Sequence, residues 1–490
     1  MKAVELKNVS FSYEGYEDKV LHDASMSVDY GEVALLSGFS GEGKSAVLSL
    51  VAGIIPNITT GEITGEVLID GENITGRKMS EVCRKVGVVL QNAEAQIIQQ
   101  LVEDEIAFGC ENFAYSAEKI ASCIGGACQQ MGLRPNWKTR TLSGGQKQRL
   151  ITACTLATEQ KILVLDEPLA NLDKAGGSLL MTALRKLAAK GYAVLVVEHR
   201  LDMVLPYVDT VWNIRAGEIF KVEDKDAYLS AQTAYIRDEC NTTSPGEPAF
   251  SLEHVGFSVK GREILKDITF DIKKDERVLL LGENGCGKTT LMRLIARLSA
   301  PTKGSITQRF DSALGQKTKG SREWFRKVGV VYQNPNYQLF MPSVWQEVSY
   351  GAKSEDHAKE IMEVFGLTAL SDRHPQSLSE GQKRRVTIAA VVASEPEILL
   401  LDEPTVGQDY AGLKELVRIL NHLHERSGNT MITVTHDMRC AEAICDHAVL
   451  IENGVVSAEG GKELVRRYFG CEPGGKRCDD EKGRPSKDIA

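Results

Sequence analysis

The sequence predicts an α/β protein made of two tandem copies of one domain, each with a mainly parallel sheet as its core. Two observations support this prediction. Short motifs of the first half return in the same order in the second half, shifted by roughly 240 residues, which indicates a duplicated domain. Runs rich in Val, Ile and Leu precede turns or polar residues in both halves, as is typical of strands covered on both faces.

Five motifs carry the repeat, and chance similarity does not explain five matches in one order. The periodic stretches between them suit helices, which places the polar ends of the apolar runs at the edge of a sheet. The pairs are GFSGEGKS at 38–45 with GENGCGKT at 282–289, VVLQN at 88–92 with VVYQN at 330–334, LSGGQ at 142–146 with LSEGQ at 378–382, ILVLDEP at 162–168 with ILLLDEP at 398–404, and VVEH at 196–199 with TVTH at 433–436.

Composition shifts divide the chain into two domains, a join and a tail. We expect the first domain at 1–222, a linker at 223–248 and the second domain at 249–470. The join begins with VEDKDAYLSAQTAYIRDE, which is polar enough for a surface helix, and continues with the turn-rich NTTSPGEPA. Residues 471–490 are polar and rich in Gly, Lys and Asp, which predicts a disordered tail.

The overall composition excludes several classes of protein. Among 490 residues, 42% are hydrophobic and 26% charged, as in soluble globular proteins, and no run of eighteen apolar residues occurs. The N-terminus lacks the apolar core of a secretion signal. The eleven cysteines form no C-x-x-C pair, which favours reduced thiols in a cytosolic protein over a zinc site or disulfides. A net charge of −9 argues against bulk nucleic-acid binding.

Both glycine-rich motifs match G-x-x-x-x-G-K-[ST] directly after a predicted strand and before an apolar helical stretch, the context that this phosphate-binding loop requires. Backbone N–H groups would surround phosphate oxygens, Lys44 would reach the β- and γ-phosphates, and the Ser45 hydroxyl would bind Mg²⁺. The expected ATP-contacting residues are Gly38, Phe39, Ser40, Gly41, Glu42, Gly43, Lys44, Ser45 and Ala46 in the first half, and Gly282, Glu283, Asn284, Gly285, Cys286, Gly287, Lys288, Thr289 and Thr290 in the second.

Acidic pairs at strand ends complete each expected site. Asp166 and Asp402 end apolar strands, which is the usual position of the aspartate that holds Mg²⁺ through water. Glu167 and Glu403 follow directly, where a carboxylate could orient and deprotonate the attacking water. These two glutamates are therefore the candidates for the general base.

A histidine and a glutamine are repeated near each acidic pair. His199 and His436 end the next strands, where an imidazole could reach the γ-phosphate. Gln91 and Gln333 would place an amide at the metal ion or at the water. The expected metal-binding residues are Ser45, Gln91, Asp166, Thr289, Gln333 and Asp402.

LSGGQ, followed by the apolar strand that ends in the Asp-Glu pair, resembles the signature of the ATP-binding cassette family. The resemblance occurs once in each half and so covers essentially the whole chain. It implies Mg²⁺-dependent ATP hydrolysis by two cassettes, each with a parallel core, a helical signature subdomain and an antiparallel β portion. It further implies that the signature loop of one cassette presses on the γ-phosphate held by the other. Whether the cassettes pair within one chain or between two chains stays open.

The resemblance implies two composite sites. The first joins the phosphate-loop, acidic, glutamine and histidine residues of the first half, Lys44, Ser45, Gln91, Asp166, Glu167 and His199, to Ser379, Gly381 and Gln382. The second joins Lys288, Thr289, Gln333, Asp402, Glu403 and His436 to Ser143, Gly145 and Gln146. Gly144 and Glu380, within the two signature loops, are also expected to contact ATP. A helix N-terminus that starts at each serine suits an anion, and glycines permit close backbone approach. The segments 171–173 and 408–409 match the part of the family that links the two sites.

The two halves are not identical. Tyr13 matches the aromatic residue that stacks on adenine in this family, whereas its counterpart is Val259. Because stacking of a base on an aromatic ring contributes about 1–3 kcal/mol, the second site should bind adenine more weakly. Glu380 replaces Gly144 in the second signature. Neither difference touches the catalytic set, so both sites are expected to hydrolyse ATP, at unequal rates.

The segment after Gln333 resembles the Q-N-P-x-x-Q-L-F pattern of energy-coupling-factor ATPases, which power uptake of vitamins and of cobalt or nickel ions. This resemblance implies transmembrane coupling and substrate-binding partners, no nucleic-acid partner, and a cytoplasmic protein bound peripherally at the inner face of the cell membrane. The segment after Gln91 matches less well, lacking the proline and phenylalanine. Two alternatives are a soluble twin-cassette ATPase that acts on ribosomes or nucleic acid, and the fused ATPase of a sugar importer.

Overall fold

The chain folds into two compact units, Met1–Ala234 and Tyr235–Ala490. The structure is a computed structural model, and it describes residues 1–15, 18–39, 41–170, 172, 174–232, 246–314 and 319–470. Within these ranges, no helix combines the length and the apolar character needed to cross a bilayer. The expected tail at 471–490 lies outside the described residues.

The first unit contains two sheets. A four-stranded antiparallel sheet has the order β2-β1-β4-β5, and a six-stranded sheet has the order β10-β9-β3-β8-β7-β6. In the larger sheet all strands run parallel except β10, which pairs antiparallel with β9 at one edge. The strands are β1 Lys2–Tyr13, β2 Leu21–Asp29, β3 Val33–Gly38, β4 Gly61–Ile69, β5 Glu72–Asn73, β6 Val86–Val89, β7 Ile162–Asp166, β8 Ala193–Val197, β9 Thr210–Arg215 and β10 Glu218–Val222.

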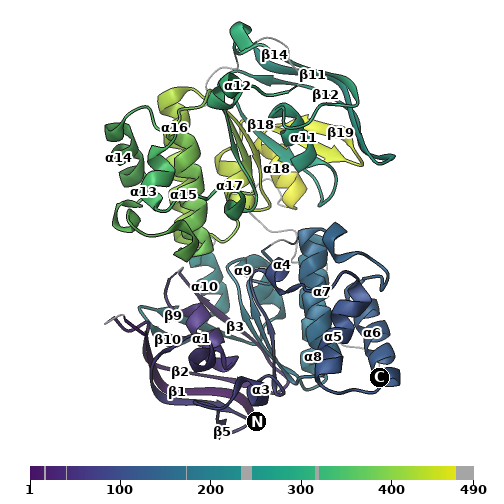
Figure 1. Ribbon diagram of the computed structural model, residues 1–490, viewed down its shortest axis with the longest axis vertical. Coiled ribbons are helices and arrows are strands. Elements are labelled where there is room, and N and C mark those ends of the chain that lie inside the picture. The colour runs from purple at the N-terminus through teal and green to yellow at the C-terminus, as the bar shows by residue number, and fades with distance from the viewer. Residues whose placement is uncertain are drawn as a thin grey trace. The chain divides into compact units, whose positions relative to one another are not determined.

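Helices cover both faces of the parallel sheet of the first unit (Figure 1). The helices are α1 Lys44–Val51, α2 Ile54–Asn57, α3 Met79–Val82, α4 Ala93–Gln96, α5 Val102–Asn112, α6 Ala117–Met131, α7 Gly144–Ala157, α8 Lys174–Ala189, α9 Leu201–Val204 and α10 Lys225–Gln232, with 3-10 turns at Thr139–Thr141 and Leu205–Tyr207. Helix α10 falls in the range expected to be the linker, and its Tyr228 and Leu229 pack against the core of the first unit. The sequence predicts a surface helix here, and the structure shows that one side of α10 packs against the core of the first unit.

The second unit has one nine-stranded sheet, of order β14-β11-β12-β19-β18-β13-β17-β16-β15. The antiparallel part joins the parallel part through a single pairing of Asp267 with Val455. The strands are β11 Pro248–Val259, β12 Arg262–Lys273, β13 Arg277–Leu281, β14 Lys303–Gln308, β15 Val328–Val331, β16 Ile398–Asp402, β17 Thr430–Val434, β18 His447–Glu452 and β19 Val455–Gly460. The predicted parallel core and antiparallel portion are therefore confirmed.

The helices of the second unit follow the order of the first, except that among the described residues α2 has no helical counterpart and the 3-10 turn Pro335–Tyr337 stands in place of α4. They are α11 Lys288–Ile295, α12 Arg322–Lys327, α13 Val344–Ser349, α14 Glu355–Val364, α15 Glu380–Val392, α16 Tyr410–Ser427, α17 Met438–Ala443 and α18 Lys462–Phe469, with 3-10 turns at Ser312–Leu314, Pro335–Tyr337, Thr368–Leu370 and Pro375–Ser377. The longest, α16, begins where the Asp409 carboxylate accepts from the Gly412 N–H and ends at Gly428, which has a φ of 58°.

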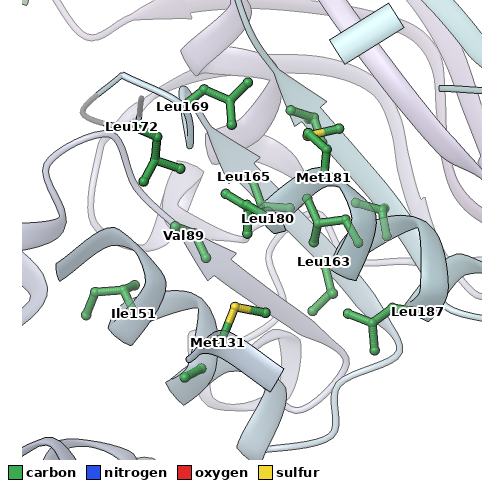
Figure 2. Packing of buried hydrophobic residues seen from close by; sticks show 14 of the residues in the cluster. Val89, Met131, Ile151, Leu163, Leu165, Leu169, Leu172, Leu180, Met181 and Leu187 are labelled. Atoms are coloured by element: carbon green, nitrogen blue, oxygen red, sulfur yellow. The ribbon is translucent and has the colours of Figure 1, made fainter. Parts of the chain in front are cut away.

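The apolar strands are buried on both faces, as their sequences predict. In β7, Leu163 and Leu165 contact one core cluster, whereas Ile162 and Val164 contact the other. Figure 2 shows the first of these clusters, in which side chains from β6, β7 and α8 pack together with those of α6 and α7. This packing holds the ends of the parallel strands side by side, and the candidate site residues follow those ends.

Candidate functional site

Each phosphate loop closes around its own lysine. In the first unit the loop between β3 and α1 places the buried Lys44 Nζ 2.9 Å from the Gly38 carbonyl oxygen and 2.6 Å from that of Phe39, and the ammonium donates to both. Lys288 Nζ donates in the same way to Gly282, at 2.7 Å, and to Glu283, at 2.9 Å. The ammonium therefore lies inside the ring of backbone groups, where a phosphate oxygen would meet it.

The first glycine of each loop is required by close approach of the backbone. Gly38 has a φ of 152°, and a Cβ there would lie 2.4 Å from the Ile214 carbonyl oxygen of β9. Gly282 has a φ of 143°, and its Cβ would lie 2.3 Å from the carbonyl oxygen of Ile451. Any side chain would push the loop away from the neighbouring strand.

Some of the loop residues expected to contact ATP have other contacts. The Glu42 carboxylate accepts from the Ala216 N–H in the turn between β9 and β10, which ties the loop to that turn. Asn284 Oδ1 lies 3.0 Å from His436 Nε2 and so joins the second loop to the histidine. Phe39 is 36% exposed, and Ala46 is buried in α1. Ser40 lies outside the described residues.

The hydroxyl and carboxylate expected to hold Mg²⁺ are brought together in both units. Ser45 Oγ lies 3.5 Å from Asp166 Oδ2, and Thr289 donates a hydrogen bond to Asp402. Burial, followed by the charge of Glu167, raises the pKa of Asp166 to about 7; burial and the charge of Glu403 raise that of Asp402 to about 6. Oxygen donors that carry buried, poorly compensated negative charge fit a hard divalent cation.

Glu167 is held by the other two predicted catalytic residues of its unit. Gln91 Nε2 donates to Glu167 Oε2 at 2.7 Å, and His199 Nε2 lies 3.3 Å from Oε1. Burial acts to raise the pKa of Glu167, but the hydrogen bond and charge of His199 and the charge of Lys44 outweigh it and leave the pKa below its ordinary value. The carboxylate is therefore ionised at neutral pH, as a proton acceptor must be.

Glu403 has a similar setting. Its Oε1 lies 3.3 Å from His436 Nε2, and its Oε2 accepts from the His436 N–H at 3.2 Å. Both glutamates have a positive φ, 45° at Glu167 and 51° at Glu403, and both N–H groups donate to the adjacent strand, to Val197 and to Val434 at 2.9 Å. Gln333 follows β15 as Gln91 follows β6.

Both signature loops open a helix with a capping box. Ser143 Oγ accepts from the Gln146 N–H at 3.3 Å, and Gln146 Oε1 accepts from the Ser143 N–H at 2.9 Å. Ser379 and Gln382 repeat the arrangement at the start of α15. The serine therefore caps its own helix, while the N–H groups of the two residues directly after it are not used by the regular hydrogen bonds of the helix.

The residues at the end of the first strand of each unit differ, and both are exposed in the structure. Tyr13 ends β1, is 36% exposed, and packs edge to face against Phe11 with ring centroids 4.8 Å apart. Its counterpart Val259 ends β11 and is 44% exposed. One ring face is thus available in the first unit and a small aliphatic group in the second.

Two residues that the motifs did not single out tie the histidine of the first unit to the segment after Glu167. Glu198 is buried; its Oε1 accepts from the Leu169 N–H at 2.8 Å and its Oε2 from the His199 N–H at 2.8 Å. Arg200 donates to the carbonyl oxygens of Leu169 and Leu172. A charged residue that ends an apolar strand, where the other half has Thr435, is the signal that could have identified Glu198.

The segments expected to link the two sites are described in part. Asn171 and Asp173 lie outside the described residues. In the second unit, Gln408 Nε2 donates to the Gly381 carbonyl oxygen at 3.1 Å, and Asp409 caps α16. The segment at 408–409 therefore contacts the signature loop of its own unit.

Comparison with known proteins identifies the family. A family model described as ABC transporter matches residues 21–170 and 265–406, more than half of the chain. The chain belongs to the ABC transporter family. The two matches cover both phosphate loops, both signatures and both strand-end acidic pairs, and ABC ATPases hydrolyse ATP with Mg²⁺.

Relatives align over most of the length of this ABC ATPase. The "Putative ABC transporter ATP-binding protein" of Methanosarcina mazei is 31% identical, with 93% of this chain and 88% of the relative covered. The "Putative HMP/thiamine import ATP-binding protein YkoD" of Bacillus subtilis is 30% identical, with 93% and 90% covered. Among solved structures, "RNase-L Inhibitor" has a TM-score of 0.64 at 21% identity, covering 94% of this chain and 92% of its own, a likeness of fold.

The second phosphate loop of this ABC ATPase offers a direct chemical test. Cys286 Sγ lies 3.9 Å from Lys288 Nζ, and burial raises the pKa of the thiol despite the nearby ammonium. We expect slow alkylation of Cys286 by iodoacetamide at neutral pH, a faster reaction at higher pH, and loss of ATP binding at this loop after labelling. Saturating MgATP should protect the thiol.

Peptide mass spectrometry measures this labelling at each cysteine. Cys83, which is half-buried and lies at the end of α3, serves as the internal control, since its labelling should not respond to nucleotide. An unchanged rate at Cys286 under saturating MgATP would contradict the expected position of the phosphates.

Proposed function

We propose that this chain is the ATP-hydrolysing energy-coupling subunit of a membrane importer of the energy-coupling-factor type, for a vitamin or a transition-metal ion. The observation that carries the proposal is a pair of exposed aromatic side chains after Gln333. Tyr337 is 69% exposed and Phe340 71%. Side chains of this size at the surface favour a partner protein over solvent.

The backbone that carries these aromatic residues is held firmly. Gln338 Oε1 accepts from the Tyr332 N–H at 2.8 Å, and Gln338 Nε2 donates to the Val330 carbonyl oxygen at 2.7 Å. The buried Glu347 accepts from the N–H groups of Phe340 and Met341, at 3.0 and 2.7 Å. A loop held at both ends presents its side chains in a fixed arrangement, which favours docking.

The first unit has the same construction with smaller side chains. Gln96 Oε1 accepts from the Leu90 N–H at 2.9 Å, and Glu105 accepts from the N–H groups of Ile98 and Gln99. Ile98, which is 68% exposed, stands where the second unit has Phe340. Two loops of one design but different surface chemistry suit a partner whose two contact segments differ.

The name of one relative supports the importer reading and its substrate class. The Bacillus subtilis protein is named for HMP/thiamine import, and it aligns over nine-tenths of both chains. The likeness to RNase-L Inhibitor and to an archaeal ribosome recycling factor, both at 21% identity, concerns the fold alone. A soluble role on ribosomes is therefore the alternative, and affinity purification distinguishes it from the importer role.

The catalytic roles follow from the chemistry of the site residues. Lys44 and the loop N–H groups would bind the phosphates, and Ser45 with Asp166 would hold Mg²⁺, which withdraws charge from the phosphoryl oxygens. Glu167 would accept the proton of the attacking water, while Gln91 and His199 orient its carboxylate. The second set would act in the same way with Lys288, Thr289, Gln333, Asp402, Glu403 and His436.

Family resemblance supports a further element of the proposal, that each signature loop completes the ATP site of the other cassette. The capping boxes at Ser143 and Ser379 leave backbone N–H groups of the first helical turn for an anion. ATP would then bind the cassettes to each other, and hydrolysis would let them separate. Such a cycle can drive a membrane partner mechanically.

The docking proposal is tested with the double variant Tyr337→Ser and Phe340→Ser. We expect its ATP turnover in detergent-free solution to stay within about twofold, since exposed side chains contribute little to stability, while association with integral membrane proteins in purified membranes is lost. Association is measured by affinity purification from solubilised membranes and mass spectrometry.

The matched control is Phe220→Ser, because Phe220 is an exposed aromatic residue, 51% exposed, on the edge strand β10. It should leave membrane association unchanged. Recovery of the unmodified chain with ribosomes, and not with integral membrane proteins, would overturn the proposal in favour of the soluble alternative.

A further inference from the structure

A buried arginine on the signature helix of the second unit holds the glutamine loop. Arg384 lies on α15 and is 2% exposed. Its Nη1 donates to the Tyr332 carbonyl oxygen at 2.8 Å, and its Nη2 donates to that of Gln333. One guanidinium thus bonds the two carbonyls on either side of the Gln333 Cα, whose side chain is proposed to reach the metal ion or the water.

The charges around Arg384 keep it a cation. Burial lowers its pKa to about 10, and the negative charges of Glu380, Glu403 and Asp402 oppose that change. Glu380 precedes Arg384 by four residues on α15, the favourable order for a helical acid–base pair, and also bonds Lys383 Nζ at 3.1 Å. The hydrogen bonds to the loop are therefore charge-assisted, and stronger than neutral ones.

The first unit lacks this connection. The repeat aligns Gln148 of α7 with Arg384, and Gly144 with Glu380. Within the described part of the chain, both polar atoms of the buried Gln148 amide have no hydrogen-bond partner. The Gln91 side chain donates to Glu167. The acid and the arginine are thus both present in the second unit and both missing from the first.

We propose that Arg384 is a positioning residue for ATP hydrolysis at the second phosphate loop: it fixes the Gln333 backbone to the signature helix α15, so that Gln333 and the signature loop move as one body. The inference rests on the proposed role of Gln333. It also assigns a purpose to Glu380, whose charge supports the buried cation. In the first unit the loop after Gln91 meets its signature helix α7 through a different contact, an ion pair of 2.6 Å between Glu94 Oε1 and Lys147 Nζ.

The hydrogen bonds of Arg384 have a consequence for how movement of the second glutamine loop reaches the signature helix. A movement of the loop at 332–338, where the exposed Tyr337 lies, is passed through Arg384 directly to α15. In the first unit a movement of the equivalent loop reaches Glu167 through Gln91. The two hydrogen bonds of Arg384 therefore couple movement of the 332–338 loop to α15 through the loop backbone.

The test uses the full chain with Glu167→Gln, so that turnover comes from the second catalytic set. We expect Arg384→Gln, which copies cassette one, to lower kcat about tenfold and to raise the KM for Mg²⁺, while the KM for ATP changes less than about twofold. Arg384→Lys, which can bond one carbonyl, should recover part of kcat. Arg418→Gln, at an arginine 61% exposed on α16, is the control and should change none of these constants.

A second measurement separates this inference from the role of Gln333 itself. Hydrogen exchange of the 332–338 amides should accelerate in Arg384→Gln, with exchange in β16 and β17 unchanged. If Gln333→Ala lowers kcat and Arg384→Gln does not, the inference is overturned and the role of Gln333 stands. If neither change lowers kcat, the role of Gln333 is overturned, and the inference with it. Equal losses in kcat and in ATP affinity would also overturn it.

Discussion

Replacing Glu167 and Glu403 together by glutamine is expected to lower ATP turnover by the full chain about 10²–10⁴-fold, the range that a positioned general base contributes. Glutamine keeps the shape of the side chain but cannot accept a proton. In each unit the glutamate carboxylate lies 3.3 Å from a histidine Nε2, so we expect the change to glutamine to slow hydrolysis at both sites. Phosphate release measures turnover, and nucleotide binding should persist because both loop lysines remain.

The single variants decide whether both sites hydrolyse. Each is expected to retain measurable turnover, because the other unit keeps its complete catalytic set. The two residual rates should differ, since the residue that we expect to face adenine is Tyr13 in one unit and Val259 in the other, and Glu380 replaces Gly144 in the second signature. Complete loss from one single variant, with normal turnover in the other, would contradict the expectation of two active sites.

The parts of each site that lie close together in sequence were predictable from it. The phosphate loops, the strand-end acidic pairs and the following histidines occur as short motifs, and parallel strands bring their carboxyl ends to one edge of the sheet. The apolar runs predicted a sheet buried on both faces, and Leu163 and Ile162 do face opposite core clusters. Local pattern and sheet geometry sufficed for these features.

Contacts between loops were not predictable in this way. Glu198 meets the Leu169 N–H, and Arg384 meets the Gln333 carbonyl, only because helices and strands distant in sequence pack together. Glu198 lies within VVEH, where the other half has Thr435, and a charged residue directly after an apolar strand was the available hint. Arg384 lies in the polar run GQKRR, where nothing in the sequence distinguished it. Helix α10 packs on the first unit through Tyr228 for the same reason: a polar sequence with two apolar side chains does not reveal what those side chains contact.

Replacing Arg277 by alanine is expected to destabilise the second unit by about 3–5 kcal/mol, because it leaves buried partners uncompensated. Arg277 is 1% exposed at the start of β13. Its Nε donates to Asp446 Oδ2 at 2.9 Å and its Nη1 to Asn421 Oδ1 at 2.8 Å. It therefore connects β13 to α16 and to the residue before β18. Hydrogen exchange of amides in β13, β16 and β17 reports the free energy of unfolding of this unit separately.

Two comparisons help to interpret the loss from Arg277→Ala: the equivalent position of the first unit, and an exposed ion pair. At the equivalent position Val33 replaces the arginine, and its N–H donates to Asp209 at 2.9 Å without a buried cation. Arg418→Ala, which removes an exposed pair with Glu415, should cost less than about 1 kcal/mol. A loss of similar size from Arg277→Ala would mean that the buried network contributes no more than a surface ion pair.

The same network predicts a pH dependence of stability. Burial acts to raise the pKa of Asp446, but the hydrogen bonds and charge of Arg277 outweigh it and hold the pKa below its ordinary value. Because the carboxyl has a lower pKa in the folded state, its contribution is complete above the unfolded value, about 3.9, and is lost as the pH falls through the folded value. Arg277→Ala should therefore flatten the dependence of the second unit's stability on pH below about pH 4, measured by acid unfolding. An unchanged slope of the unfolding free energy against pH would show that other carboxylates, and not Asp446, cause the acid sensitivity.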